Sequence, residues 1–165
     1  QKEGLPVTGE ATPHHILFSC DDIPDNDANW KMAPPLGNDE DRAAIRAAVK
    51  DGTLGIFATD HAPHPASTKK GGFIGTANGI IGLEVAVAIT YRVMVEQEGM
   101  DVDEWAKRWS DGPARLIGEE PDGETVIDLR ANRTVGEGTF RSLSRNMPYM
   151  GLSFSAWPLP TGHMV

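Results

Sequence analysis

GIFATDHAPH (residues 55–64) is the stretch that decides the fold: an apolar run ends on Asp60, and His61 and His64 follow it. Residues 53–59 are apolar on both sides, which is typical of a parallel strand covered by helices on both faces. At the carboxyl end of such a strand, a side chain points into the mouth where α/β enzymes carry out their chemistry. A carboxylate buried there must be hydrogen-bonded, paired or bound to a metal ion, because a bare one is strongly disfavoured.

The segments on either side alternate between strand and helix, as in two consecutive βα units. Asn38 predicts a helix start, and Gly52 predicts its end. Glu10 ends the first predicted strand. The predicted order is strand 5–11, helix 38–52, strand 53–59, loop 60–78 and a mostly apolar, buried helix at 79–99.

Three further segments are less regular. The connection 12–37 has no strong helical or strand pattern and is longer than structural loops normally are, so we expect an ordered functional loop there. The sequence pattern of residues 101–118 predicts one or two helices, with Trp105 and Trp109 on one face. After Pro121 the pattern predicts a small β appendage with short strands at 124–129, 133–135 and 148–157.

The composition is that of a soluble globular protein: 165 residues, 39% hydrophobic and 24% charged. A net charge of -9 argues against nucleic acid and against an anionic membrane as partners. The single cysteine, Cys20, excludes an internal disulfide and a cysteine-built metal site, which suits a reducing cytosol. The sequence shows no signal peptide, and it begins without an initiator methionine, so we expect Gln1 not to be a natural N-terminus.

Two βα units cannot bury a parallel sheet alone. A (β/α)8 barrel takes about 250 residues. The chain is therefore either a small open sheet or the last quarter of a barrel.

Asp60 itself has two interpretations. It could cap a loop, with the histidines packed around it. The preceding strand, the second histidine and the long loop that follows favour a hard-oxygen metal ligand and general base, with His64 reaching the substrate.

Several stretches, in order, resemble bacterial dihydroorotases of the amidohydrolase superfamily. The resemblance covers about residues 3–98 and resumes more weakly beyond. The stretches that carry it are VTGEATPHHILF (7–18), DNDANWKMAPPLGNDEDRAAI (25–45), FATDHAPH (57–64), GTANGIIGLE (75–84), GPARLIG (112–118) and SRNMPYMGLSFSAWP (144–158).

The resemblance implies an α/β fold, the C-terminal part of a (β/α)8 barrel with a piece of a small β domain. Residues 1–118 would form the last βα units, about strands seven and eight, and the helices after them. Residues 119–165 would belong to the small β domain. As a separate polypeptide we expect the chain to aggregate or stay molten, to be inactive and to bind no zinc tightly, because strand edges and apolar faces would be exposed.

The family's metal ligands, as the resemblance implies, are a His-x-His pair after the first strand, a carboxylate or carboxylated lysine, two further histidines and an aspartate on the eighth strand. Only the last, Asp60, lies in this chain. Zinc is the family's usual ion, as one or two ions. Asp60 would also take a proton from the attacking water and pass it to the departing amide nitrogen.

Other roles follow from the same resemblance. His64 would bind the substrate, and Asn78 and Gly79 lie where the family uses backbone groups for this, although Asn78 could merely cap the next helix. Ala33 replaces a frequent asparagine, so any substrate contact there must be backbone or apolar. Glu10 matches a glutamate near the metals in some relatives, and would support a ligand or act as an extra one; the alternative is a buried, hydrogen-bonded carboxylate without a role at the metals.

Three histidines and one glycine complete this comparison. We expect His14, His15 and His61 to be structural. Gly37 replaces a frequent arginine, and this change, like Ala33, bears on which substrate is bound rather than on the metal chemistry.

The implied function is reversible ring closure of N-carbamoyl-L-aspartate to L-dihydroorotate in de novo pyrimidine biosynthesis, in the cytoplasm. Alternatives are an allantoinase or hydantoinase, a non-catalytic partner of aspartate transcarbamoylase, and a free-standing interaction domain. The expected partner is the small-molecule substrate, with a homodimer or an aspartate transcarbamoylase complex left open. Asp60 and His64 argue against a non-catalytic role, because an inactive barrel needs neither.

Overall fold

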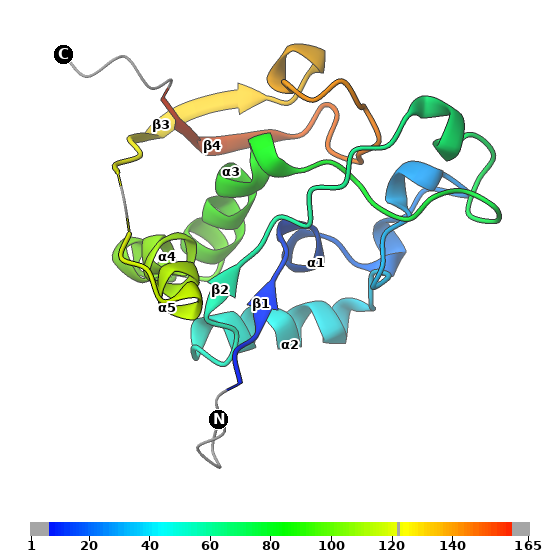
Figure 1. Cartoon of the computed structure of the whole chain (residues 1–165). Coiled ribbons are helices and arrows are strands. Elements are labelled where there is room, and N and C mark those ends of the chain that lie inside the picture. Colours follow the sequence, from blue (N-terminus) through cyan, green and yellow to red (C-terminus); the bar gives the residue numbers. More distant parts are fainter. Residues whose placement is uncertain (1–6, 122, 160–165) are drawn as a thin grey trace.

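Two short strands form a parallel pair at the centre of the computed structural model, which describes residues 7–121 and 123–159 (Figure 1). β1 (Glu10–Ala11) and β2 (Ile56–Phe57) pair with Glu10 opposite Ile56. The parallel direction predicted for these segments is confirmed. Both strands are shorter than expected, because ladder hydrogen bonds form only where the two strands face each other. The start of the predicted strand 5–11, residues 5 and 6, lies outside the described residues.

The helix after the long connection is confirmed. α2 (Asp39–Lys50) begins at Asn38, whose side chain accepts a hydrogen bond from the amide of Asp41 at 2.9 Å. The Asp41 carboxylate accepts one from the Asn38 amide in return, at 3.0 Å. This reciprocal cap satisfies two amide groups that the helix leaves unpaired. Gly52, with φ +83°, follows the helix end.

The connection 12–37 is more regular than predicted, and this expectation was wrong in part. It contains α1 (Pro13–Leu17), which Thr12 caps, and two single 3-10 turns at Cys20–Asp22 and Ala28–Trp30. The signal for α1 was Thr12 followed by Pro at the first helical position. A helix this short has too few residues to show a hydrophobic period.

The helix predicted at 79–99 begins later, at Leu83, with a 3-10 turn. α3 (Ala86–Thr90) then continues directly into a π-helical segment, Tyr91–Gln97. α4 (Val102–Trp109) and α5 (Asp111–Ile117) follow, so the expected pair of helices is confirmed. The indole N–H groups of Trp105 and Trp109 both donate to the Thr90 hydroxyl at 3.0 Å, which fixes α4 against α3.

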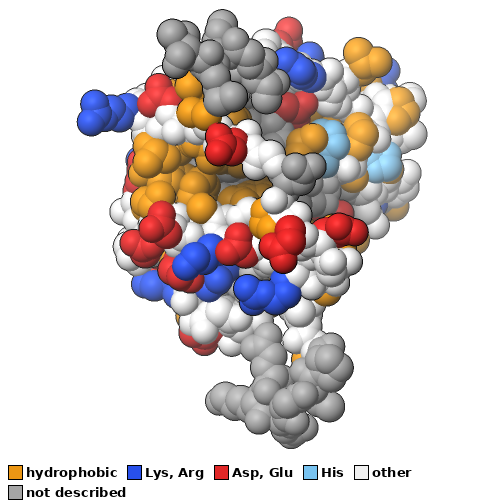
Figure 2. Space-filling model, turned by 60° about the vertical axis from the view of Figure 1, so that its left-hand side comes forward, with side chains coloured by type: hydrophobic (Ala, Val, Ile, Leu, Met, Phe, Trp, Pro, Cys, Tyr) orange, Lys and Arg blue, Asp and Glu red, His pale blue; other side chains and the backbone are white. Residues whose placement is uncertain are grey.

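An apolar hollow of about 600 Å³ lies beside α4. Figure 2 looks onto this side of the molecule, where apolar side chains gather next to charged ones. The hollow is lined by Val87, Trp105, Ala106, Trp109, Ser110, Pro121, Gly123, Thr125 and Ile127.

The C-terminal strands form one antiparallel pair rather than three short strands. β3 (Ile127–Thr134) joins the first two predicted strands, and β4 (Ser153–Pro158) is the end of the third. A register shift between Asp128 and Asn132 interrupts the ladder. Figure 1 shows this pair lying against α3, on the side away from α2.

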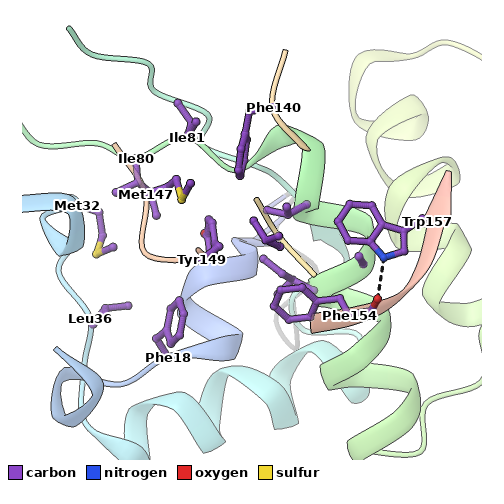
Figure 3. Packing of buried hydrophobic residues seen from close by; sticks show 14 residues of the cluster. Phe18, Met32, Leu36, Ile80, Ile81, Phe140, Met147, Tyr149, Phe154 and Trp157 are labelled. Carbon is purple, nitrogen blue, oxygen red and sulfur yellow. Dashed lines mark hydrogen bonds between the residues drawn. The ribbon is translucent and has the colours of Figure 1, made fainter. Parts of the chain in front are cut away.

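The main hydrophobic cluster joins the C-terminal segment to the rest of the chain (Figure 3). Tyr149, Phe154 and Trp157 pack in the same cluster as residues from α3 and from the connection 12–37. Phe18 stacks on Tyr149 with ring centroids 5.9 Å apart. Residues on both sides of residue 118 thus share one hydrophobic core. The division of the chain into two domains at residue 118 stays a proposal. Within the described ranges no helix is long and apolar enough to cross a membrane.

Candidate active site

Asp60 lies just past β2, at the carboxyl end of the parallel pair. Its backbone has φ +47°, a left-handed conformation that non-glycine residues adopt rarely and that often marks functional sites. The side chain is exposed, and no described residue donates a hydrogen bond to its carboxylate. Glu10, on the neighbouring strand β1, is also exposed. Both carboxylates are therefore free to contact groups from outside the described residues.

Asp60 fits one position of a metal site, and the described residues do not complete it. No three His, Cys, Asp or Glu side chains come together anywhere in residues 7–121 and 123–159. A free carboxylate supplies the hard oxygen ligand that a divalent cation takes. The role of Asp60 as a metal ligand stays a prediction.

His61 has a structural contact, as expected. Its Nδ1 accepts hydrogen bonds from the backbone amides of Gly82 at 3.2 Å and Leu83 at 3.1 Å. These amides begin the 3-10 turn that leads into α3, so His61 caps it with a side-chain acceptor. An Nδ1 that accepts two bonds leaves the ring proton on Nε2.

The structure brings His64 and Gly79 together. Gly79 has φ +118°, and a Cβ atom there would lie 3.0 Å from His64 Nε2 and 2.7 Å from Ala62 Cβ. Only glycine fits, because both the conformation and the space exclude a side chain. The His64 ring is half-buried and has no hydrogen-bond partner among the described residues, so its nitrogens are available to a ligand.

The backbone of Gly79 is already engaged within the protein. Its N–H donates to the carbonyl of Lys31 at 3.0 Å, and its carbonyl accepts from Lys69 Nζ at 2.9 Å and Asn146 Nδ2 at 3.0 Å. Asn78 next to it is exposed and makes no hydrogen bond to the described residues. Among the described residues, the backbone groups of Gly79 are thus already paired, whereas those of Asn78 are not.

Ala33, predicted to contact substrate, is exposed and precedes a cis peptide bond to Pro34. The carbonyl of Pro34 lies 3.1 Å from His15 Nε2, and His15 Nδ1 lies 2.6 Å from the Thr12 hydroxyl. His15 therefore holds the Ala33 turn against α1, which is a structural role.

Two lysines that sequence reasoning missed hold the loop 60–78. Lys69 Nζ donates to the carbonyls of Lys31 (3.3 Å), Ala77 (3.0 Å) and Gly79 (2.9 Å). Lys31 Nζ donates to the carbonyls of Phe73 (2.6 Å) and Thr76 (2.5 Å). Burial, and then the nearby Lys31, lower the pKa of Lys69. No sequence pattern distinguishes these lysines from solvated ones.

His14, beside this region, is almost fully buried. Burial, followed by the charge of His15, lowers its pKa to about 3, so it is neutral at physiological pH. Its Nε2 has no hydrogen-bond partner within the part of the chain that the structure describes. Its ring packs 4.4 Å from that of His15.

No family model matches the sequence. The chain is 39% identical over 170 residues to a dihydroorotase of Brevibacillus brevis and 37% identical over 169 residues to one of Listeria innocua. Each alignment covers 98% of this chain and 40% of the relative, so the chain spans about two fifths of these relatives. The resemblance to dihydroorotases is thereby confirmed.

Solved structures confirm the fold class. An L-hydantoinase from Arthrobacter aurescens superposes with a TM-score of 0.86 at 22% identity, and a D-hydantoinase from Thermus sp. with 0.81 at 21%. Each covers 95% of this chain and 38% of the other. At this identity the likeness concerns the fold alone, which is that of part of a (β/α)8 barrel.

Proposed function

We propose that the protein containing this chain, whose sequence is similar to those of dihydroorotases, interconverts N-carbamoyl-L-aspartate and L-dihydroorotate. The observation that carries the proposal is the identity of 36–39% to curated dihydroorotases over 98% of the chain. A free carboxylate at Asp60, beside a turn that brings His64 to Gly79, is compatible with this chemistry. The reaction belongs to pyrimidine biosynthesis, and we infer a cytoplasmic location.

Asp60 would hold a divalent metal ion, which we propose is zinc, together with ligands from outside the described residues. Such an ion polarises a carbonyl and lowers the pKa of water. In hydrolysis, the Asp60 carboxylate takes a proton from the attacking water as the new C–O bond forms. It then gives that proton to the ring nitrogen as the C–N bond breaks. One carboxylate can serve as both base and acid because the proton that it takes from water is the one that it gives to the nitrogen.

The remaining residues would orient the substrate. We propose that His64 donates a hydrogen bond to the substrate ring or its carboxylate, and that Asn78 contributes backbone groups. Ala33 would offer a backbone or apolar contact, and Glu10 would support a metal ligand. A homodimer and a complex with aspartate transcarbamoylase are both compatible with this site.

A hydantoinase is the second candidate, because the solved structures with this fold carry that name. This chain is 22% identical to the L-hydantoinase from Arthrobacter aurescens and 39% identical to the dihydroorotase of Brevibacillus brevis. The higher identity favours the first proposal.

The test is turnover by the full-length protein of L-dihydroorotate, hydantoin and allantoin at equal concentration. We expect dihydroorotate to have by far the highest kcat/KM. A preference for hydantoin would overturn the proposal in favour of the hydantoinase, and a preference for allantoin would overturn it in favour of an allantoinase. No turnover of any of the three would favour a non-catalytic partner.

A further inference from the structure

Asn146 lies in the segment before β4 and is 4% exposed. Its Oδ1 accepts a hydrogen bond from the His64 amide at 3.2 Å, and its Nδ2 donates to the carbonyls of Ala62 and Gly79, both at 3.0 Å. Its own carbonyl accepts from the Ile81 amide at 3.0 Å. One residue thus joins the segment 62–64 after β2 to the segment 79–81 before α3.

A side-chain amide is the group that this position requires. It must accept one hydrogen bond and donate two in one plane, which an asparagine amide can do and a carboxylate of the same shape cannot. In an aspartate, an oxygen would face the carbonyls of Ala62 and Gly79 with no proton to share. Both carbonyls would then lose a partner in a buried site.

The neighbouring residues fix Asn146 in place. Met147 and Tyr149 are buried in the main hydrophobic cluster, and Figure 3 shows Met147 beside Ile80. The C-terminal segment is therefore anchored on the core on one side and bonded to the His64 turn on the other. Its position in the sequence, over 60 residues from each partner, gives no hint of this contact.

We propose that Asn146 is a positioning residue for substrate binding, acting through His64 and Gly79, so that the C-terminal segment sets the geometry of this side of the site. The inference rests on the proposed function. Asn146 itself need not touch the substrate. It holds the backbone at His64, from which the imidazole projects, and the carbonyl of Gly79, the residue at which a Cβ would lie 3.0 Å from His64 Nε2.

The first test uses the full-length protein with Asn146→Asp and, as a matched control, Asn132→Asp. Asn132 is exposed on β3, and its side chain makes no hydrogen bond to the described residues. Misplacement of a binding group predicts a rise in KM for dihydroorotate of roughly tenfold to a hundredfold, with kcat and bound metal nearly unchanged. The control should match wild type. An Asn146→Asp protein with wild-type KM would overturn the proposal.

A double-mutant cycle separates positioning from general stability. If Asn146 acts through His64, then Asn146→Asp should change KM by less than about twofold once His64→Ala is present. If Asn146→Asp raised KM in the His64→Ala protein by the same factor as in wild type, the two residues would act independently and the proposal would be wrong.

Hydrogen exchange gives a readout that does not depend on activity. In Asn146→Asp the carboxylate can still accept from the His64 amide, but it repels the carbonyls of Ala62 and Gly79 and so opens the turn. The His64 and Ile81 amides, which donate to this residue, should therefore exchange faster, whereas the amides of α2 should keep their wild-type protection. Unchanged protection at both amides would contradict the proposal that Asn146 holds these two segments together. Asn146→Ser, which adds no buried charge, gives the same comparison if the aspartate variant does not fold. If the wild-type protein did not turn over dihydroorotate, the proposed function would be refuted. The hydrogen-exchange comparison would then still show whether Asn146 holds the His64 turn.

Discussion

The ammonium group of Lys69 lies 2.9 Å from the carbonyl oxygen of Gly79 and also donates to the carbonyls of Ala77 and Lys31. Each of its three N–H donors therefore has a backbone acceptor. The same Gly79 carbonyl accepts from Asn146, and the Gly79 amide donates to Lys31. The turn that approaches His64 is fixed from the loop, from the connection 12–37 and from the C-terminal segment.

Lys69→Met should loosen this turn, because methionine keeps most of the side-chain length and donates no hydrogen bond. We expect the free energy of unfolding of the full-length protein to fall by about 1–3 kcal/mol, measured by denaturant titration, and KM for dihydroorotate to rise. Lys70→Met is the control, since Lys70 is exposed and has no partner among the described residues. Equal behaviour of the two variants would show that Lys69 does not hold the turn.

Gly79→Ala should damage the site more than an alanine elsewhere. The new Cβ would meet Ala62 and His64, and the residue would have to keep φ +118°. We expect a loss of about 1–3 kcal/mol in unfolding free energy, with a higher KM because the His64 ring must move. Gly138→Ala is the control, because nothing lies within 4 Å of a Cβ there and its φ is outside the left-handed region that disfavours a side chain. Wild-type KM in Gly79→Ala would contradict the assigned contact.

His14 should make stability depend on pH. Its pKa is about 3 when folded and 6.5 when unfolded, so below pH 6.5 the unfolded chain takes up a proton that the folded chain refuses. Stability therefore falls as pH drops from about 6.5 towards 3. Between pH 7 and pH 5, His14 should account for about 2 kcal/mol of lost unfolding free energy.

His14→Phe removes this titration while keeping a buried ring. Denaturant titrations of the full-length protein at pH 7 and pH 5 should show a smaller decrease for the variant than for wild type. A decrease of the same size in both proteins would mean that His14 is protonated in the folded state.

Local signals made part of the fold predictable from the sequence. α2 is bounded by Asn38 and Gly52, which act on neighbouring residues, so its limits were predicted within two residues. The parallel direction of β1 and β2 followed from an apolar run that has no polar face. The lengths of these strands could not be predicted, because they depend on which partners the ladder finds.

The candidate site was predicted only where a motif marked it. Asp60 and His64 belong to one short stretch after β2, and the strand and loop around them point to chemistry. Lys69 and Asn146 were missed because nothing in the sequence shows which backbone carbonyls their side chains reach. These partners lie 8 to 38 residues away for Lys69 and up to 84 residues away for Asn146. The fold alone brings such donors to the carbonyls of a turn, and a lysine or asparagine in a loop carries no signature of it.

The most direct test of the central claim is the turnover of L-dihydroorotate by the full-length protein with Asp60→Asn. The amide keeps the shape of the side chain but cannot accept and return a proton, so kcat should fall by at least about a hundredfold. Asp103→Asn, on the exposed face of α4, should keep the wild-type rate. An Asp60→Asn protein that hydrolyses dihydroorotate as fast as wild type would contradict the role given to this carboxylate.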